Sequence, residues 1–392
     1  MFELSGKYGK ANVYAETIDD SCISQIYGFL NNPITKDVKV AVMPDANTGK
    51  GSTVGFTQEI KDKVNPSMVG VDVGCGMLVL KVSKDFHMDL PKLDKVMHQK
   101  IPSGLKHCDK VSPFAKNINL KELIADVNYD KELLGLSSLG GGNHFAEVDK
   151  DQNGDYYIVI HSGSRHLGVA VCEYWEKVAN NFHKKLAVKK SELINAKNEK
   201  GLAELPEVVT SYGLSYLMGD DLKGYLHDMK ITQEFARLNR EAMLDVICTE
   251  MGIKKRYILD KFCTIHNYID LDKMILRKGA ISLEKDEVAI IPISMAYGSL
   301  IVKGKGNPDW NYSGPHGAGR LLSRSDAKNS ISMADYKKSM EGIYTTSVNS
   351  STIDESPMAY KNPDEIIKAI EDTAEIINII KPIYNFKASS EG

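Results

Sequence analysis

The sequence lacks long apolar runs, an excess of positive charge and paired cysteines, and each absence excludes a class of protein. No apolar stretch reaches the ~18 residues that a bilayer-spanning helix needs, so we expect no membrane span. Lysine and arginine total 49 against 52 aspartates and glutamates, a formal net charge of −3. A general nucleic-acid coat is strongly basic. Any nucleic-acid contact is therefore local, or uses metal ions to offset phosphate charge.

Other absences concern the redox compartment and the chain's start. The six cysteines are scattered without a Cys-x-x-Cys pair, at positions 22, 75, 108, 172, 248 and 263. This excludes a zinc ribbon and a disulfide framework. The first ten residues carry Glu3 and no apolar core, so we expect no signal peptide and a cytoplasmic protein. With 392 residues, 42% hydrophobic and 26% charged, and no internal repeat, the composition is typical of a globular protein.

Apolar patterning predicts the order of elements. Strands are expected within residues 1–90, where Val38–Met43 and Met68–Val71 each end in a polar turn, and at 156–160, 262–265 and 286–303. Helices are expected at 115–135, 170–252 and 363–381, the last with an apolar stripe of Ile366, Ile370, Ile377 and Ile380. Because strands and helices are mixed rather than alternating, we expect an α+β fold. We expect one domain of residues 1–392, with 170–252 as a helical region within it.

Four segments place metal-binding side chains beside polar or glycine-rich turns. They are Asp72 and Cys75 in DVGCGM, His144 in LGGGNHFAE, His161 in VIHSGSR and His266 in TIHNY. Binding residues usually collect in loops at strand ends. The oxygen, nitrogen and sulfur ligands suit Mn, Fe, Co or Zn better than Mg or Ca, and fill two four-coordinate sites if the thiolate bridges. Singly, such a cysteine or histidine is more often structural, so their co-occurrence carries the hypothesis.

Two glycine-rich segments suggest phosphate chemistry. The three glycines at 140–142 let backbone N–H groups approach a phosphate, although they also fit an ordinary loop. In SGPHGAGRLLSR, His316 lies between glycines and is followed by Arg320 and Arg324. A histidine so placed could attack a phosphorus atom while the arginines stabilise the developing charge. The alternative is a glycine-rich helix start with solvent-facing arginines.

Together these motifs resemble the RtcB family of RNA-splicing ligases. That family joins RNA 3′-phosphate or 2′,3′-cyclic phosphate ends to 5′-hydroxyl ends, using GTP and manganese. The resemblance runs in order along nearly the whole chain, through VMPDANTGKGSTVG (42–55), VGVDVGCGM (69–77), LGGGNHFAEV (139–148), HSGSRHLG (161–168), LNREAM (238–243), HNY (266–268), RKGAIS (277–282), IPISM (291–295), HGAGRLLSR (316–324) and DESPMAYKN (354–362).

The resemblance implies roles for individual residues. It makes His316 the histidine that is covalently guanylylated. Two Mn²⁺ ions would be held by Asp72, Cys75, His144, His161 and His266, with Cys75 bridging. The implied guanylate contacts are Asn143, His144, Phe145, Ala146, Glu147 (on the guanine), His266, Asn267, Pro292, Ile293, Ser294, Met295, Ser299, His316, Gly317, Ala318, Gly319 and Lys387. The implied partners are GTP, RNA with these ends and, where one is required, an archease-like activator.

Two departures from the family pattern are visible. Asn47 stands where the family's MPDVH segment has a histidine, and asparagine cannot donate a proton near neutral pH as a protonated histidine can. The family typically stops at Val-Lys-Gly, whereas this chain ends Asn-Phe-Lys-Ala-Ser-Ser-Glu-Gly. The family's lysine is thus present as Lys387, but the residues that follow it differ. The alternative to a nucleotide-contacting role is that Lys387 is a solvated residue of the C-terminal tail.

Two other functions fit the same motifs. A metal-dependent phosphodiesterase or phosphatase would hydrolyse RNA ends without joining them, and would not need His316. A non-catalytic RNA-end sensor would bind GTP without covalent labelling.

Overall fold

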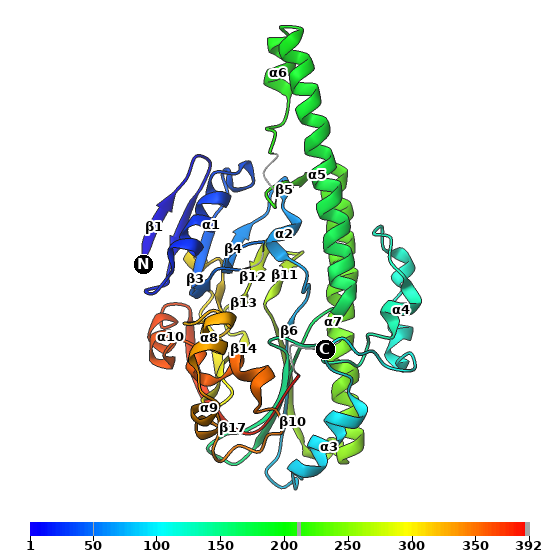
Figure 1. Cartoon of the computed structure of the whole chain (residues 1–392), viewed down its shortest axis with the longest axis vertical. Helices are drawn as coiled ribbons and strands as arrows, with labels where there is room; N and C mark the ends of the chain where they lie inside the picture. Colours follow the sequence, from blue (N-terminus) through cyan, green and yellow to red (C-terminus); the bar gives the residue numbers. More distant parts are fainter. Residues whose placement is uncertain (50, 210–212, 389–392) are drawn as a thin grey trace.

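Two β-sheets and two long helices form the framework of the molecule (Figure 1). The computed structural model describes residues 1–49, 51–209 and 213–388. Lys50 of the VMPDANTGKGSTVG segment and the last four residues of the C-terminal departure lie outside the described residues. Within these ranges helices and strands are mixed, and the fold is α+β as the sequence predicts.

The sheets contain six and seven strands. The first has the order β1 (Phe2–Ser5), β2 (Lys10–Val13), β3 (Val40–Asn47), β4 (Val54–Glu59), β12 (Ile275–Lys278) and β11 (Asn267–Asp270). The second has the order β10 (Ile258–Ile265), β6 (Gly76–Val82), β8 (Tyr156–Ser162), β7 (Phe145–Lys150), β17 (Ala374–Lys387), β15 (Gly298–Gly304) and β14 (Val288–Ser294). Two-stranded ribbons pair β13 (Ala280–Ser282) with β16 (Ser313–Pro315), and β5 (Lys63–Val64) with β9 (Leu217–Met218). In the seven-stranded sheet every neighbouring pair is antiparallel.

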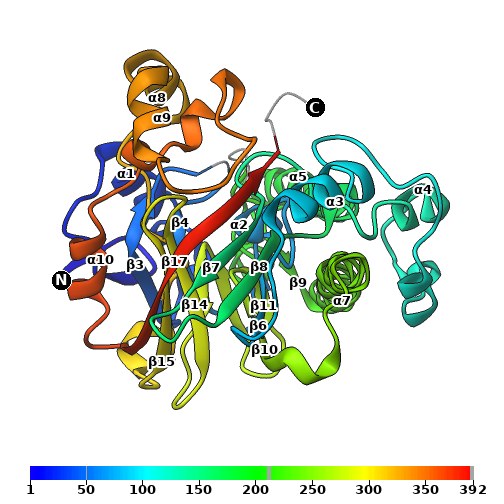
Figure 2. The same cartoon turned by 90° about the horizontal axis from the view of Figure 1, so that it is seen from below.

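Helices cover the sheets and connect them (Figure 2). The α-helices are α1 (Asp20–Leu30), α2 (Pro66–Val69), α3 (Leu90–Lys100), α4 (Tyr129–Leu133), α5 (Arg165–Asn195), α6 (Glu199–Glu204), α7 (Gly219–Met251), α8 (Arg324–Ser330), α9 (Met333–Ser339) and α10 (Pro363–Ala369). Short 3₁₀ turns lie at Pro33–Thr35, Pro113–Asn117, Leu120–Glu122, Lys255–Tyr257, Pro308–Trp310, Ser350–Glu355 and Pro357–Ala359. Among the described residues, none of these helices combines the length and the apolarity of a membrane span.

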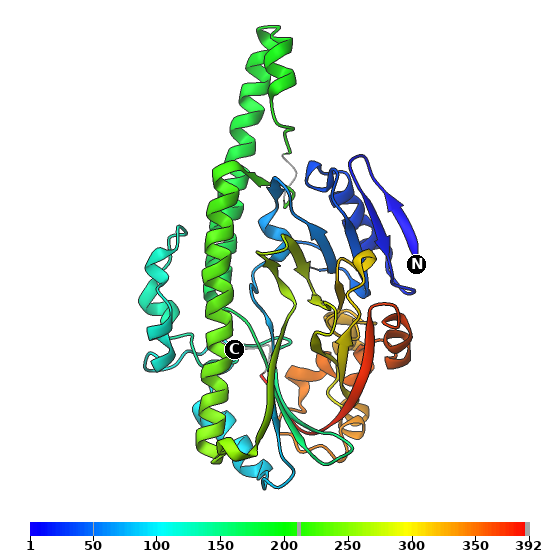
Figure 3. The same cartoon turned by 180° about the vertical axis from the view of Figure 1, so that it is seen from behind.

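Helices α5 and α7 pack side by side, and the far half of α5 projects past the sheets together with α6 (Figure 3). The predicted helical region at 170–252 is thus two long helices, interrupted between α6 and α7 by a non-helical segment that contains β9. Leu186 is the last buried residue of α5. Beyond it no side chain of the helix is buried, and Val188 and Ile194 face solvent.

The predicted helix at 363–381 is wrong after its first half. Helix α10 ends at Ala369, and β17 follows from Ala374 to Lys387. Ile366 is buried in the helix, whereas Ile377 is exposed and Ile380 is buried as alternating residues of a strand. The isoleucine-rich stretch favours β structure, and pairing with both β7 and β15 decides it.

Three other local predictions need correction. The segment 115–135 is not one helix but 3₁₀ turns followed by α4, because asparagines 119 and 128 accept backbone N–H bonds that start new turns. Met68–Val71 is not a strand, since Pro66–Val69 forms α2. The expected turn at residues 44–47 belongs to β3. The Asp72–Gly76 turn therefore leads into a strand, β6, instead of ending one.

A buried carboxylate fastens the irregular 113–133 segment to the long helices. Asp228 of α7 accepts hydrogen bonds from Ile124 N, Ala125 N and Trp175 Nε1, each at 2.9 Å. Its side chain is fully buried. Burying these three N–H groups away from water would be costly, and the hydrogen bonds to the Asp228 carboxylate offset that cost.

We expect Asp228→Ala to lower the free energy of unfolding by about 3 kcal/mol, since three buried donors lose a charged acceptor. Urea unfolding measures this. The control is Asp220→Ala at the start of the same helix, where the carboxylate is exposed and pairs only with Lys223. Equal destabilisation by both variants would contradict the assignment.

Candidate active site

One edge of the seven-stranded sheet gathers the predicted metal ligands. Cys75 precedes β6 and His144 precedes β7, while His161 lies near the end of β8 and His266 follows β10. These four strands are neighbours in the order β10-β6-β8-β7 and run antiparallel. The start of one strand therefore lies beside the end of the next, and all four side chains meet at the same edge.

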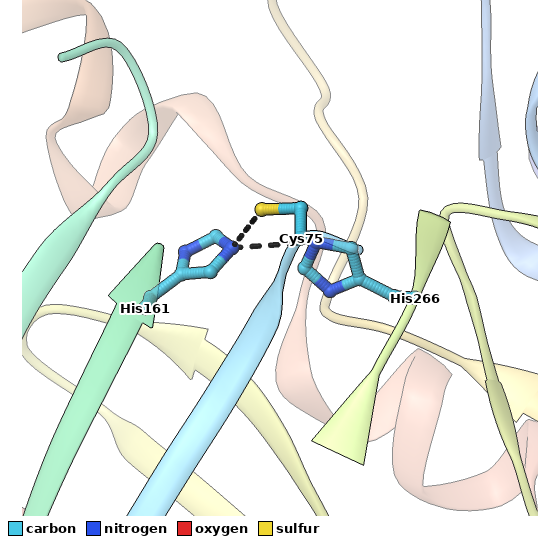
Figure 4. A group of neighbouring side chains, drawn as sticks. All are labelled: Cys75, His161 and His266. Atoms are coloured by element: carbon cyan, nitrogen blue, oxygen red, sulfur yellow. Dashed lines mark hydrogen bonds between the residues drawn. The ribbon is translucent and has the colours of Figure 1, made fainter. Parts of the chain in front are cut away.

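The ligand atoms form two groups that share one sulfur. In one group are Asp72, Cys75 and His144, and in the other are Cys75, His161 and His266, each with ligand atoms within 4.8 Å of one another. The Cys75 sulfur lies 3.2 Å from His161 Nε2, and Figure 4 shows this contact beside the 3.3 Å approach of His161 Nε2 to His266 Nε2. The sulfur also lies 3.4 Å from His144 Nε2, which is 3.0 Å from Asp72 Oδ2.

Hydrogen bonds to the outer nitrogens aim two imidazoles at this centre. His144 Nδ1 lies 2.8 Å from the Leu139 carbonyl, and His161 Nδ1 lies 3.2 Å from the Asn143 carbonyl. A carbonyl only accepts, so each Nδ1 carries a hydrogen. Neutral His161 therefore presents an Nε2 lone pair toward the Cys75 sulfur, and His144 Nε2 faces the Asp72 carboxylate. Nitrogen, sulfur and carboxylate oxygen atoms that converge in this way are the arrangement a bound cation needs.

Burial sets the ionisation of the cluster. It lowers the pKa of His161 and of His266 well below the usual value, and the neighbouring histidines lower it further, so both imidazoles are neutral. Burial, then the Asp72 charge, raises the pKa of the Cys75 thiol. Burial also acts to raise the pKa of Asp72, but His144 outweighs it and holds that pKa below its ordinary range. A metal cation would reverse the preference of Cys75, because thiolate is the ligand form. The residues fit a metal centre.

Helix α7 holds the ligand-bearing loops in place. Arg240 Nη1 donates at 2.7 Å to the carbonyls of Gly74 and Ser162, next to Cys75 and His161 in the chain. Asn239 accepts from the backbone of Ser137 and Ser138 and donates to the carbonyls of Ser138 and Gly163. Both side chains are buried. The LNREAM segment of the sequence contains these residues, but its pattern alone assigned them no role.

A cavity of about 670 Å³ opens beside the metal-binding edge. His316 lines it, with its ring 4.8 Å from that of His266 between centroids. Asp45 Oδ2 lies 2.6 Å from His316 Nδ1 and accepts from the His316 backbone N–H at 3.0 Å. With Nδ1–H donating to the buried carboxylate, His316 Nε2 is the nitrogen left for chemistry. Sequence reasoning missed Asp45, although its carboxylate stands in the MPDAN segment.

The cavity brings together most of the predicted nucleotide contacts. Its lining includes Asn143, Phe145, Glu147, His161, His266, Pro292, Ile293, Ser294, Met295, His316, Gly317, Ala318, Gly319 and Lys387. Asn47 lines it too, and its Nδ2 donates to the Asp45 carbonyl at 3.1 Å.

Four predicted contacts are not part of that lining. His144 lies in the metal-binding cluster instead. Ala146 points to the opposite face of β7, where it packs with Leu78 and Ile160. Asn267 instead joins backbone segments, since its Oδ1 accepts from Gly279 N at 2.9 Å. Ser299 is buried on β15.

Two acidic residues at the cavity wall, Asp354 and Glu355, pair with the basic side chains around them. Lys387 Nζ lies 2.6 Å from Glu355 Oε2 and its side chain is 7% exposed, so it is a buried strand residue and not a solvated tail. Arg324 pairs with Glu355 and Asp354, and Arg320 Nη2 donates to the Asp354 carbonyl at 2.6 Å. Arg320 is therefore tied to the wall, with its side chain 18% exposed. Arg324 does start helix α8, and its side chain stays 46% exposed while it pairs with the two carboxylates.

Comparison with known proteins agrees with this geometry. The family model described as tRNA-splicing ligase RtcB matches residues 30–128 and 115–388. The chain belongs to the RtcB family. It is 30% identical over 381 residues to the RNA-splicing ligase RtcB of Escherichia coli strain K12, covering 88% of each chain. It is 26% identical over 417 residues to the tRNA-splicing ligase RtcB of Aeropyrum pernix, covering 83% of this chain and 82% of the relative. The RNA-splicing ligase RtcB2 of Escherichia coli strain ATCC 25922 is 26% identical over 410 residues, with 95% and 93% covered.

We expect Arg240→Lys to weaken divalent-metal binding at this cluster about 10- to 100-fold, the usual cost of losing a group that orients metal ligands. An ammonium cannot bond both carbonyls in the guanidinium geometry. Isothermal titration calorimetry measures the affinity, with Arg237→Lys, one turn earlier and partly exposed, as the control. Unchanged affinity in Arg240→Lys would contradict the positioning role.

The Glu355 cluster predicts a pH-dependent stability. Burial acts to raise the pKa of Glu355, but Lys387 and Arg324 lower it to about 2 from 4.5. A lowered carboxyl pKa stabilises the folded state above pH 4.5, and that contribution is lost as the pH falls toward 2. We expect Glu355→Gln to cost about 3 kcal/mol at pH 7 and less below pH 4.5, whereas exposed Glu341→Gln costs little. Urea unfolding at several pH values tests this, and a pH-independent cost would contradict it.

Proposed function

We propose that this chain joins RNA 3′-phosphate or 2′,3′-cyclic phosphate ends to 5′-hydroxyl ends, with GTP as the energy source. The observation that carries the proposal is His316, held by Asp45 in a cavity beside a buried Cys/His/Asp cluster. Membership of a family whose model is described as a tRNA-splicing ligase supports it. So does the relatives' naming as RNA-splicing ligases.

In the first proposed step, His316 Nε2 attacks the α-phosphorus of GTP. A nitrogen–phosphorus bond forms, the bond to the β-phosphate oxygen breaks, and pyrophosphate leaves. Asp45 accepts from Nδ1–H, so it orients the ring and stabilises the positive charge that the ring acquires. Gly317, Ala318 and Gly319 line the same cavity, and we propose that they would lie beside the phosphates of GTP.

We further propose that two Mn²⁺ ions bind at Asp72, Cys75, His144, His161 and His266, with Cys75 in both sites. When bound, they would neutralise phosphate charge during transfer. This accounts for how a chain with a net charge of −3 could hold RNA ends. The protein's own part is to keep His161 and His266 neutral and to orient the rings of His144 and His161.

In the later proposed steps, water opens a cyclic end to a 3′-phosphate, whose oxygen takes GMP from His316 and breaks the nitrogen–phosphorus bond. The RNA 5′-hydroxyl then attacks the activated phosphate, and GMP leaves as the phosphodiester forms. Such transfers depend on positioning and charge neutralisation. An archease-like activator and a cytoplasmic setting belong to the same proposal.

The competing functions differ at His316. A metal-dependent phosphodiesterase or phosphatase would use the metal cluster alone, and an RNA-end sensor would bind GTP without transferring GMP. Neither needs a histidine nitrogen held free by a buried carboxylate, which is why the His316–Asp45 pair favours the ligase.

We expect incubation with GTP labelled at the α-phosphate to give a Mn²⁺-dependent covalent label that is acid-labile and alkali-stable. His316→Ala should abolish it, and Asp45→Asn should slow it roughly 100-fold, because the ring loses its charged acceptor. Exposed His87→Ala is the matched control.

Two results would contradict the proposal. A label that persists in His316→Ala would move the nucleophile elsewhere. Full activity of His316→Ala on RNA ends, with no label in the parent chain, would favour the hydrolase.

A further inference from the structure

A second carboxyl group lies directly behind Glu147, away from the cavity. Glu147 and Asp149 are two residues apart on β7, so their side chains point to the same face. Both are buried, but only Glu147 reaches the cavity. Sequence reasoning assigned no role to Asp149.

The two carboxyl groups differ in their hydrogen-bond partners. Glu147 Oε2 accepts from Asn385 Nδ2 at 2.9 Å. Neither carboxyl oxygen of Asp149 receives an N–H or O–H donor from the described residues. The hydroxyl of Tyr157, its cross-strand neighbour, is directed to Asp151 at 3.3 Å. The group that Asp149 does contact is the Glu147 carboxyl.

Two carboxyl groups in contact in the protein interior cannot both be ionised, and one proton between them satisfies both. Burial raises the pKa of Glu147 to about 7. Burial, then Glu147, raises that of Asp149 well above its ordinary range. Because Asn385 donates to Glu147 and no such donor reaches Asp149, the hydrogen-bond pattern favours the proton on Asp149. The cations nearby are Lys387, which is paired with Glu355, and Lys381, whose Nζ donates to the Tyr297 carbonyl. Neither lysine therefore donates a hydrogen bond to Asp149 that could take the place of the shared proton.

We propose that Asp149 is a positioning residue for guanine recognition: its protonated carboxyl donates to Glu147, so that Glu147 keeps a negative oxygen toward the cavity. That oxygen would accept the N1–H and N2–H donors that guanine presents and adenine does not. The inference rests on the proposed function, in which Glu147 meets the guanine of GTP. It assigns purine selectivity to a residue that does not touch the nucleotide.

Two substitutions separate this role from packing. In Asp149→Asn the amide still donates a hydrogen bond to Glu147. In Asp149→Leu the side chain fills the same space and suits the apolar interior, but it cannot donate a hydrogen bond to Glu147. Glu147 then takes up the proton itself. The control is Asp155→Asn at the turn of the same hairpin, where the carboxylate pairs with Lys81.

The readout is the covalent labelling reaction with GTP and with inosine triphosphate, which lacks the N2 amine. We expect Asp149→Leu to raise the KM for GTP about tenfold or more and to erode the preference for GTP, with little change in the rate at saturation. Asp149→Asn should stay within about threefold of the parent chain, since it preserves the donor. A packing role predicts the reverse order, with leucine tolerated better than asparagine in the apolar interior, and that order would overturn the proposal.

An infrared measurement tests the shared proton without GTP. The parent chain at neutral pH should show the carbonyl stretch of a protonated carboxyl group that is absent in Asp149→Asn. Absence of that difference would overturn the proposal even if labelling proceeds normally. A parent chain that shows the band but takes no label from GTP would instead refute the proposed function, while the proton pair stands.

Discussion

The site depends on one constraint, which is that unprotonated nitrogens and a thiol are packed together away from water. His161 Nε2 approaches both His266 Nε2 and the Cys75 sulfur closely. Such an arrangement is costly unless a cation occupies the space that the lone pairs face. The carbonyl groups at Leu139 and Asn143 fix the ring orientations, and Arg240 fixes the loops, so the rest of the site serves this cluster.

The Asp45 carboxylate keeps His316, which lines the cavity, separate from that cluster. His316 lies next to His266, yet its Nδ1 faces Asp45 and not the metal-binding edge. His316 follows β16, which lies outside the seven-stranded sheet, so its imidazole is not one of the clustered ligands. Such a division, with several imidazoles in the cluster and one outside it, suits the proposed covalent transfer beside a metal centre.

Sequence could predict which candidate ligands cluster, because each stands in a long motif and because antiparallel strands bring their ends to one edge. It could not predict the helpers. Asp45, Asn239 and Arg240 act through side-chain contacts with segments over 70 residues away, which no local pattern encodes. The α+β class was predictable from the mixture of patterns, whereas β17 was not. Its isoleucines favour a strand, but their spacing also fits one face of a helix, and pairing with β7 and β15 decides between the two. Ala146 and Asn267 show that membership of a motif does not by itself place a side chain in the cavity.

The central claim is that the Cys75 sulfur is shared by two metal ions. Anomalous X-ray scattering from crystals grown with Mn²⁺ tests it most directly. The account predicts two anomalous peaks, one on each side of the Cys75 sulfur, the first beside Asp72 and His144 and the second beside His161 and His266. A single peak that is remote from the sulfur, or no peak at saturating Mn²⁺, would contradict it.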